Sequence, residues 1–236
     1  MILEGALSVE AALRANSRPI ERILLASGKL DTQVARIEKA ARAADIPVER
    51  AAAAQIDALA QGTTHGGIIA EAGPRRTLPL ADLLPAGFIA MLDGIEDPYN
   101  TGYAIRALYA AGADGVVIRP RDWQTGIVVR ASAGATELIP TATAASPQAA
   151  AEYLRVHGLR IAATGLTEDA VSLYDADLRA PLFLLIGGEK RGITRSFLQA
   201  ADLVLRIPYA RPDFPQSLGT AAAVGALAFE VMRQRR

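Results

Sequence analysis

The 236-residue sequence contains no cysteine, only two histidines and few aromatic residues, which make up 5% of the chain. Without cysteine it has no disulfides, thiolate metal ligands or cysteine nucleophile. The two histidines, His65 and His157, are too few for a histidine-rich site, so we expect no bound metal. Charge of one sign does not predominate either, because 25 Lys and Arg residues balance 25 Asp and Glu residues. Any binding to a polyanion would therefore depend on local basic patches rather than on net charge.

Long apolar runs are also missing. The longest uncharged stretch, Ser217 to Phe229, is too short to span a bilayer. The N-terminus carries Glu4 and Glu10 and does not resemble a signal peptide. Apolar residues make up 51% of the chain, which is enough for a sizeable core. We expect a folded cytoplasmic protein of one or two domains that does not contact a membrane.

Helix and strand signals alternate over residues 1–72, and this pattern predicts a small α/β domain. Ser8 is expected to cap a helix that ends near Ala15, and Asp31 a helix that ends near Ala44. Strands are expected over residues 20–26, from Pro47 and over residues 67–72, with a helical turn over residues 55–60.

Residues 73–79, Gly-Pro-Arg-Arg-Thr-Leu-Pro, have the composition of a linker. Within it, Arg75 and Arg76 are candidates for contact with phosphate. A solvated linker explains the two arginines at least as well.

From residue 80 to residue 236 strand and helix signals alternate, which predicts an open parallel α/β sheet. The expected strands are Phe88–Leu92, Gly115–Ile118, Leu159–Ala163, Leu182–Ile186 and Leu203–Ile207. The expected helices are Thr101–Ala111, Gly126–Ala131, Ser146–Val156, Arg195–Ala201 (capped by Thr194) and Ser217–Arg233. Ligands of such sheets bind beyond the carboxyl ends of the strands, so we look for chemistry in the segments that follow them.

Three blocks of polar and glycine residues follow predicted strands. The first is Asp97-Pro98-Tyr99-Asn100-Thr101-Gly102 with Arg106 behind it, where Asn100 is expected to cap a helix. The second is Gly187-Gly188-Glu189-Lys190-Arg191-Gly192, whose glycines permit close backbone approach. The third is Ile207-Pro208, followed by Ser217-Leu218-Gly219 at the start of the last helix. Each block alone is explained by a capped helix or a glycine-rich turn with solvated charges.

Together the three blocks resemble the signature motifs of the SpoU/TrmH family of RNA 2′-O-ribose methyltransferases, part of the SPOUT superfamily. Arg130 to Ala135 is similar to the Ser-x-Gly-Ala segment of that family. Residues 1–72 look like its N-terminal substrate-binding domain, which is similar to ribosomal protein L30e. The resemblance implies a SPOUT domain over residues 80–236, with a parallel sheet and a C-terminal deep trefoil knot. It also implies a homodimer that methylates ribose in structured RNA, either rRNA or tRNA.

The resemblance further implies S-adenosyl-L-methionine as the cofactor and catalytic roles for Asn100, Arg106, Glu189 and Ser217. The cofactor would lie against Thr164, Gly165, Ile186, Gly187, Gly188, Ile207, Ser217 and Leu218. Because arginine stays protonated in proteins, Arg106 is expected to stabilise negative charge or to grip phosphate rather than to act as a simple base. Glu189 and Asn100 would orient Arg106 or the ribose, and no metal is required.

Two features depart from the family pattern. Gly219 stands where the family usually has asparagine, and the loop over residues 209–216 is longer and richer in proline. Gly219 and the balanced charge favour an alternative, an RNA-binding protein of the same fold that has lost catalysis. The presence of Asn100, Arg106, Glu189 and Ser217 together favours the enzyme. A third possibility is an ordinary flavodoxin-like binding domain, but the match of all three blocks would then be a coincidence. A Rossmann-type cofactor site is disfavoured, because no Gly-x-Gly-x-x-Gly motif follows a strand.

Overall fold

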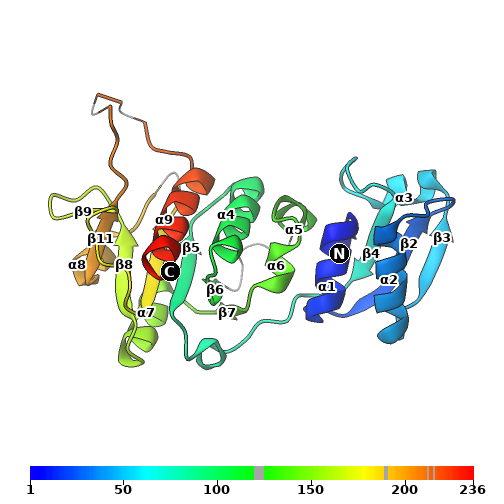
Figure 1. Ribbon diagram of the computed structural model, residues 1–236, viewed down its shortest axis with the longest axis horizontal. Coiled ribbons are helices and arrows are strands. Elements are labelled where there is room, and N and C mark those ends of the chain that lie inside the picture. Colours follow the sequence, from blue (N-terminus) through cyan, green and yellow to red (C-terminus); the bar gives the residue numbers. More distant parts are fainter. Residues whose placement is uncertain (120–124, 189–190, 212, 215) are drawn as a thin grey trace. The chain divides into compact units, whose positions relative to one another are not determined.

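A computed structural model describes residues 1–119, 125–188, 191–211, 213–214 and 216–236 (Figure 1). The chain forms two compact units. Unit 1 consists of residues 1–76 and 123–138, and unit 2 of residues 77–122 and 139–236. Unit 1 is therefore assembled from two separate stretches of the sequence.

The sheet of unit 1 has the strand order β1-β4-β2-β3. Its strands are β1 (Ile2–Glu4), β2 (Ile20–Ala26), β3 (Val48–Ala51) and β4 (Ile68–Ala72). Strand β4 is antiparallel to β1 and β2, whereas β2 and β3 are parallel. Side chains alternate along a strand, so Ile23 and Leu25 join the core on one face and Leu24 the core on the other. Helices α1 (Ala6–Ala15) and α2 (Thr32–Ala43) cover the first face, and α3 (Ala53–Leu59) covers the second.

The helix caps of unit 1 show which local predictions were correct. Asp31 caps α2 as expected, because its carboxylate accepts the Val34 N–H at 2.8 Å. The prediction for Ser8 was wrong, since α1 already begins at Ala6 and Ser8 lies inside the helix. Gly5 occupies the capping position with a φ of 84°, a conformation that glycine adopts without steric penalty. The chain can therefore turn from β1 directly into α1.

Two short helices, α5 (Gly126–Ala131) and α6 (Ala135–Leu138), belong to unit 1 and contact α1. Between them, Gly134 has a φ of 84°. A Cβ atom on Gly134 would lie 2.7 Å from both the Leu7 carbonyl oxygen and the Ala11 Cβ. The small residues of the Ser-x-Gly-Ala segment thus allow the chain to pass closely over α1.

A buried ion pair fixes α6 in unit 1. The side chains of Arg18 and Glu137 are 2% and 0% exposed. Arg18 donates from Nε and Nη2 to the two Glu137 carboxylate oxygens at 2.9 and 2.7 Å, and the Ser17 hydroxyl donates to the same carboxylate. This two-pronged geometry satisfies both oxygens, which a buried charge requires.

The described strands of unit 2 form a parallel sheet of seven strands in the order β7-β6-β5-β10-β8-β11-β9. They are β5 (Phe88–Asp93), β6 (Gly115–Ile118), β7 (Thr141–Thr143), β8 (Arg160–Thr164), β9 (Val171–Ser172), β10 (Leu182–Gly187) and β11 (Leu203–Arg206). The predicted parallel α/β sheet is confirmed. Strands β7 and β9 were not predicted, because they are only three and two residues long. Residues 182–186 of β10 are all buried, as expected for a central strand covered on both faces.

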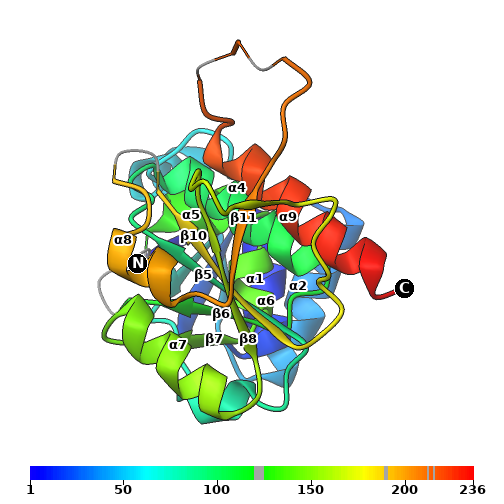
Figure 2. The ribbon, with the colours of Figure 1, turned by 90° about the vertical axis from the view of Figure 1, so that its left-hand side faces the viewer.

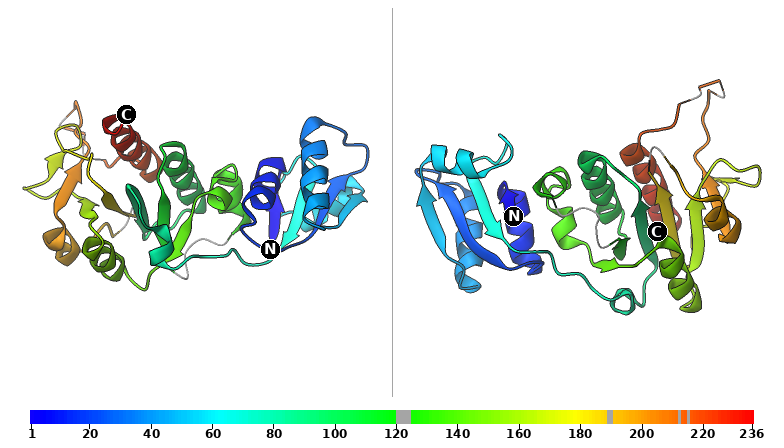
Figure 3. Two further views of the ribbon diagram at one scale, coloured as in Figure 1. Left: turned by 60° about the horizontal axis from the view of Figure 1, so that its bottom comes forward. Right: turned by 180° about the vertical axis from the view of Figure 1, so that it is seen from behind.

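Helices cover both faces of the unit 2 sheet. Helices α4 (Pro98–Ala110) and α9 (Thr220–Gln234) pack side by side on one face (Figure 2). Helices α7 (Pro147–Val156) and α8 (Arg195–Ala200) lie on the other face, as the left view of Figure 3 shows. A 3₁₀ turn, η1 (Leu80–Leu83), packs beside β7. Among the described residues no helix is both long and apolar enough to cross a membrane.

Two predicted helix starts in unit 2 were wrong. Asp97, not Asn100, caps α4, and its carboxylate accepts the N–H groups of Tyr99 and Asn100 at 2.7 and 3.4 Å. Pro98 favours this start, because proline suits the first helical position and keeps the preceding residue extended. The last helix begins at Thr220 rather than Ser217, with Gly219 at the capping position. By contrast, Thr194 caps α8 as predicted.

Candidate functional site

The carboxyl ends of the central strands of unit 2 form one edge. In the parallel register Gly187 of β10 pairs with Asp93 of β5, and Leu205 of β11 pairs with Thr164 of β8. Leu185 of β10 pairs with Ala163 of β8. Because the strands are parallel, Gly187 and Gly165, each two residues later, lie at the same height along the two strands. The predicted cofactor residues Thr164, Gly165, Ile186, Gly187 and Gly188 therefore gather at this carboxyl edge.

The glycines after β10 meet other backbone segments. The Gly188 N–H donates to the Asp93 carbonyl at 2.8 Å, and a Cβ atom on Gly188 would lie 1.8 Å from the Gly94 oxygen. A Cβ atom on Gly187 would lie 2.8 Å from the Gly192 carbonyl carbon. A side chain at either position would therefore clash with a neighbouring backbone segment. Glu189, which follows Gly188 in the sequence, lies outside the described residues.

Arg119 is a charged residue at the same edge and was not among the predicted site residues. It follows β6 directly and forms an ion pair with Asp93 at the end of β5. The Arg119 side chain is 45% exposed, whereas that of Asp93 is 16% exposed. Asp93 thus holds Gly188 through its carbonyl and Arg119 through its carboxylate. The sequence does contain a signal for Arg119, because it is a charged residue immediately after an apolar strand, where ligands of parallel sheets bind.

Helix α4 carries Asn100 and Arg106 on different sides. A helix rotates by about 100° per residue, so six residues separate these side chains by about 120° around the axis. Asn100 lies in the first turn and is half-buried, whereas Arg106 is exposed. Arg106 forms no ion pair with any described residue of the chain. Its guanidinium is therefore available to an external anion.

Arg106 shares its face of α4 with aromatic residues. Tyr99, Tyr103 and Arg106 follow the i, i+4, i+7 spacing of one helix face. Tyr99 and Tyr103 are 44% and 47% exposed, and their ring centroids lie 6.5 Å apart. The exposed face of α4 thus combines two tyrosines with a cation that has no ion pair in the described part of the chain.

The segment between β11 and α9 carries the remaining predicted site residues. Ile207 is half-buried, whereas Ser217 and Leu218 are exposed. The Leu218 N–H donates to the Tyr209 hydroxyl at 2.6 Å, and the rings of Tyr209 and Phe214 lie 6.2 Å apart. Tyr209 therefore links the two ends of this segment, which gives the unusual loop an internal anchor.

The carboxyl edge also contains groups that a bound cofactor could satisfy. In the loop after β8, the Thr167 hydroxyl oxygen is buried and has no hydrogen-bond partner among the described residues. Leu166 beside it is 91% exposed. An unpaired hydroxyl next to an exposed apolar side chain fits a ligand that carries both polar groups and an apolar ring. The described residues contain no group of three His, Cys, Asp or Glu side chains that could hold a metal.

The two linker arginines both contact groups of unit 1. Arg76 donates from Nη1 to the Asn16 carbonyl and to its side-chain oxygen at 2.5 and 2.6 Å. Burial lowers the pKa of Arg75 to about 10, partly opposed by the nearby Glu137 carboxylate. Arg75 therefore remains charged at neutral pH.

These features define an α/β protein with an open parallel sheet, a candidate ligand site at the carboxyl edge of that sheet, and a second, smaller α/β fold. Residues 87–229 match the SpoU rRNA Methylase family, and residues 2–78 match the family described as RNA 2′-O ribose methyltransferase substrate binding. The chain therefore belongs to the SpoU rRNA methylase family, as the three sequence blocks predicted.

Relatives of this chain are similar over nearly its whole length. The 23S rRNA (guanosine-2′-O-)-methyltransferase RlmB of Pseudomonas aeruginosa is 31% identical, over 98% of this chain and 95% of its own. The AdoMet-bound rRNA methyltransferase of Sinorhizobium meliloti has a TM-score of 0.82 at 27% identity, over 98% of this chain and 86% of its own. A crystallised RNA 2′-O ribose methyltransferase has a TM-score of 0.80 at 29% identity, over 100% of this chain and 88% of its own.

Proposed function

We propose that this protein methylates a ribose 2′-hydroxyl of ribosomal RNA, with S-adenosyl-L-methionine as the methyl donor. The observation that carries the proposal is the match to a guanosine-2′-O-methyltransferase over 98% of the chain, because it spans both units. The S. meliloti relative was crystallised with AdoMet, which supports the cofactor. A ribosomal RNA substrate in turn supports a cytoplasmic location.

The residues that would hold the cofactor come from three strand ends of unit 2. They are Thr164 and Gly165 at the end of β8, Ile186 to Gly188 at the end of β10, and Ile207, Ser217 and Leu218 after β11. We add Thr167, because its buried hydroxyl has no partner among the described residues. When bound, the cofactor supplies a methyl group on a positively charged sulfur. The role of the chain is to hold that methyl group in line with the ribose oxygen, and such positioning can supply much of the rate.

Arg106 is the proposed electrostatic catalyst. A ribose hydroxyl gains negative charge as it attacks, and a fixed cation lowers the free energy of that state. Arginine suits this role because it stays protonated and offers a planar fork of donors. Asn100, Glu189 and Ser217 are the proposed residues that orient the ribose or the guanidinium.

We propose that the protein forms a homodimer through the exposed sides of α4 and α9. The support is a set of large side chains there, since Tyr103 is 47% and Phe229 44% exposed. Arg106 and Asn100 lie on different sides of α4, and a second copy against the Arg106 side would enclose that residue. Sedimentation at micromolar concentration tests this proposal, and a single species of monomer mass would contradict it.

The proposed domain roles and the knot follow the family pattern. Residues 1–72 would bind RNA, with Arg75 and Arg76 of the linker 73–79 beside them, and residues 80–236 would form the SPOUT domain. The trefoil knot at the C-terminal end of this domain is proposed from the resemblance of the three sequence blocks to the family.

The test of the function is incubation with radiolabelled S-adenosylmethionine and ribosomal RNA, followed by mapping of the modified nucleotide. A label at a single ribose is expected. Calorimetry with EDTA present should show cofactor binding without RNA or metal.

The alternative, an RNA-binding protein without catalysis, is favoured by Gly219 at the capping position of α9, because the asparagine usual in the family would provide a polar side chain there. Cofactor or RNA binding with no transferred label, together with label transfer by the Gly219→Asn variant, would establish that alternative.

A further inference from the structure

The loop between β11 and α9, residues 207–219, departs from the family pattern in its length and its proline content. It begins where β11 ends, next to β8 at the carboxyl edge of the unit 2 sheet. It projects away from the sheet and from α9 in two views of the ribbon (Figure 1, Figure 2). Ile207 and Leu218, near its two ends, are among the residues proposed to hold the cofactor. The β11–α9 loop therefore lies beside the proposed site of methyl transfer.

Two aromatic side chains of this loop are exposed to solvent. Tyr209 is 39% and Phe214 53% exposed, and their ring centroids lie 6.2 Å apart at an interplanar angle of 53°. Aromatic residues make up only 5% of the chain, so two of them in one loop are more than its length predicts. Removal of aromatic surface from water is favourable, and rings left exposed on a loop therefore favour a partner that covers them.

Hydrogen bonds within the loop hold these rings. The Tyr209 hydroxyl accepts the Leu218 N–H at 2.6 Å, and the Phe214 N–H donates to the Arg211 carbonyl at 3.2 Å. Tyr209 is thus fixed at its hydroxyl end as well as at its backbone. A ring that is held before its ligand arrives loses less conformational freedom on binding. The two rings therefore form a partly preorganised surface for a planar ligand.

The charged side chains of the loop balance each other. Arg211 and Asp213 are both exposed, and neither forms an ion pair with a described residue. Binding to phosphates depends on an excess of positive charge, which this combination does not provide. A nucleic acid base instead has a planar face and an edge that carries donors and acceptors. Two rings beside one cation and one carboxylate therefore match a base better than a phosphate.

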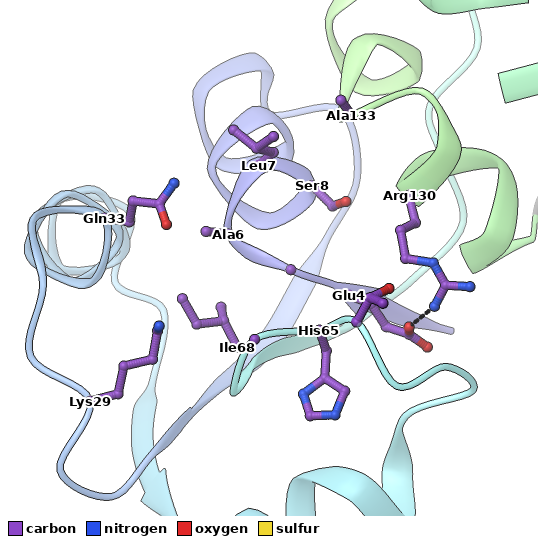
Figure 4. Close-up of a pocket in the computed structure, with 13 residues that line it drawn as sticks. Glu4, Ala6, Leu7, Ser8, Lys29, Gln33, His65, Ile68, Arg130 and Ala133 are labelled. Carbon is purple, nitrogen blue, oxygen red and sulfur yellow. Dashed lines mark hydrogen bonds and ion pairs between the residues drawn. The ribbon is translucent and has the colours of Figure 1, made fainter. Parts of the chain in front are cut away.

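The cavity of unit 1 differs from the β11–α9 loop in each of these respects. It has a volume of about 320 Å³ and is lined by the first turn of α1 (Figure 4). Its cationic side chains already have carboxylate partners, because Arg130 pairs with Glu4 and Lys29 with Asp31. Its described lining contains no Phe, Tyr or Trp side chain. A base that stacks on tyrosine or phenylalanine would thus find no such surface in this cavity.

We propose that Tyr209 and Phe214 stack on an unpaired base of the RNA substrate, at or next to the nucleotide that is methylated. Single-stranded bases are commonly recognised by stacking on aromatic side chains and by hydrogen bonds to their edges. Arg211 and Asp213 would supply those hydrogen bonds. The inference rests on the proposed function, because that function supplies the RNA. It makes the β11–α9 loop the part of unit 2 that selects the nucleotide presented to the cofactor.

The test compares two probes of equal length and charge, a short single-stranded oligouridine and the same ribose–phosphate chain without bases. Their affinities for the full-length protein are measured by fluorescence anisotropy. The wild type should bind the oligouridine more tightly than the abasic chain. Tyr209→Ala and Phe214→Ala should each weaken the binding of oligouridine about tenfold, as for loss of one base–aromatic stack. Neither variant should change the affinity for the abasic chain.

Two further variants separate stacking from structural effects. Tyr209→Phe keeps the ring and removes the hydroxyl that bonds Leu218, so it should retain most of the affinity for oligouridine. Tyr109→Ala removes a ring that is also 39% exposed, in the last turn of α4. The strand after α4 pairs with the beginning of β5, so Tyr109 lies at the end of the sheet opposite the carboxyl edge. This variant should bind both probes like the wild type.

The inference is overturned if the wild type binds both probes equally, or if Tyr209→Ala and Phe214→Ala bind oligouridine like the wild type. It is also overturned if Phe214→Ala loses affinity for S-adenosylmethionine in calorimetry or changes its mass in sedimentation. The ring would then contact the cofactor or a second copy of the chain instead of a base.

These measurements do not depend on methyl transfer, so the two proposals can fail separately. Equal binding of the two probes by a protein that methylates ribosomal RNA would overturn the base-stacking role alone. Base-dependent binding that is lost in Phe214→Ala, without transfer of label to ribosomal RNA, would support that role and overturn the proposed function alone.

Discussion

Three arginines of unit 1 and Arg106 of unit 2 differ in whether the protein provides them with a partner. In unit 1, Arg18 is buried against Glu137, Arg130 pairs with Glu4 and Arg76 bonds Asn16. In unit 2, Arg106 stands on the exposed face of α4 without an ion pair among the described residues. The arginines of the first group have partners within the protein, whereas Arg106 has no ion pair among the described residues.

The difference separates structural charges from charges available for chemistry. A buried arginine with a two-pronged carboxylate partner fixes the position of a segment, and removal of either partner leaves an uncompensated charge. An exposed arginine contributes little to stability and keeps its donors for a ligand. Variants of the two kinds should therefore affect different measurements, unfolding for Arg18 and methyl transfer for Arg106.

The largest effect on stability is expected at the buried pair. Glu137→Gln removes the charge that balances Arg18 and should lower the free energy of unfolding by about 3–5 kcal/mol. Urea denaturation measures this loss. The double variant Arg18→Met, Glu137→Leu should lose much less, because it removes both charges of the buried pair together. Equal losses in the two variants would show that the pair is not the origin of the effect.

A smaller loss is expected at the glycine turn after β10. Gly188→Ala would place a Cβ atom 1.8 Å from the Gly94 oxygen, so the two segments must separate. Overpacking of this kind typically costs about 1–3 kcal/mol. Calorimetry should show weaker cofactor binding as well. The matched variant is Gly225→Ala in α9, where a Cβ atom meets nothing within 4 Å and should not destabilise the protein.

The smallest loss is expected for Asp31→Ala, which removes the cap of α2. The pKa of Asp31 lies below its ordinary value, because its carboxylate accepts the Val34 N–H and, secondarily, pairs with Lys29. The stabilisation is therefore present above the pKa of the unfolded chain and is lost as the pH falls through the lowered pKa. Thermal unfolding of the two proteins should differ at neutral pH and converge in strong acid. A difference that persists in acid would contradict the capping role.

The elements predicted best from the sequence are those with local causes. The apolar run of β10, the Asp31 cap and the Thr194 cap depend on residues close in sequence, and all three are confirmed. Asn100 and Ser217 are equally good capping residues, yet Asp97 before Pro98 and Gly219 before Thr220 occupy those positions. Propensity alone does not decide between neighbouring candidates.

The features that escaped prediction depend on contacts between distant residues. Nothing near Glu137 in the sequence indicates that it pairs with Arg18, which is 119 residues away. The same is true of Asp93 and Arg119, whose proximity follows only from the pairing of β5 with β6. The assignment of the three blocks to one family succeeded because it used several residues at fixed spacing at once.

The most direct test of the central claim is the single-turnover rate of methyl transfer by Arg106→Ala on a mapped RNA substrate. If Arg106 stabilises the developing charge, the rate should fall by about 10²–10³, as for loss of one electrostatic donor to a developing oxyanion. Cofactor affinity, measured alongside, should stay nearly unchanged, and Arg106→Lys should restore only part of the rate because an ammonium group lacks the planar fork. An Arg106→Ala rate within a factor of about three of the wild type, below 1 kcal/mol of barrier, would contradict the catalytic assignment.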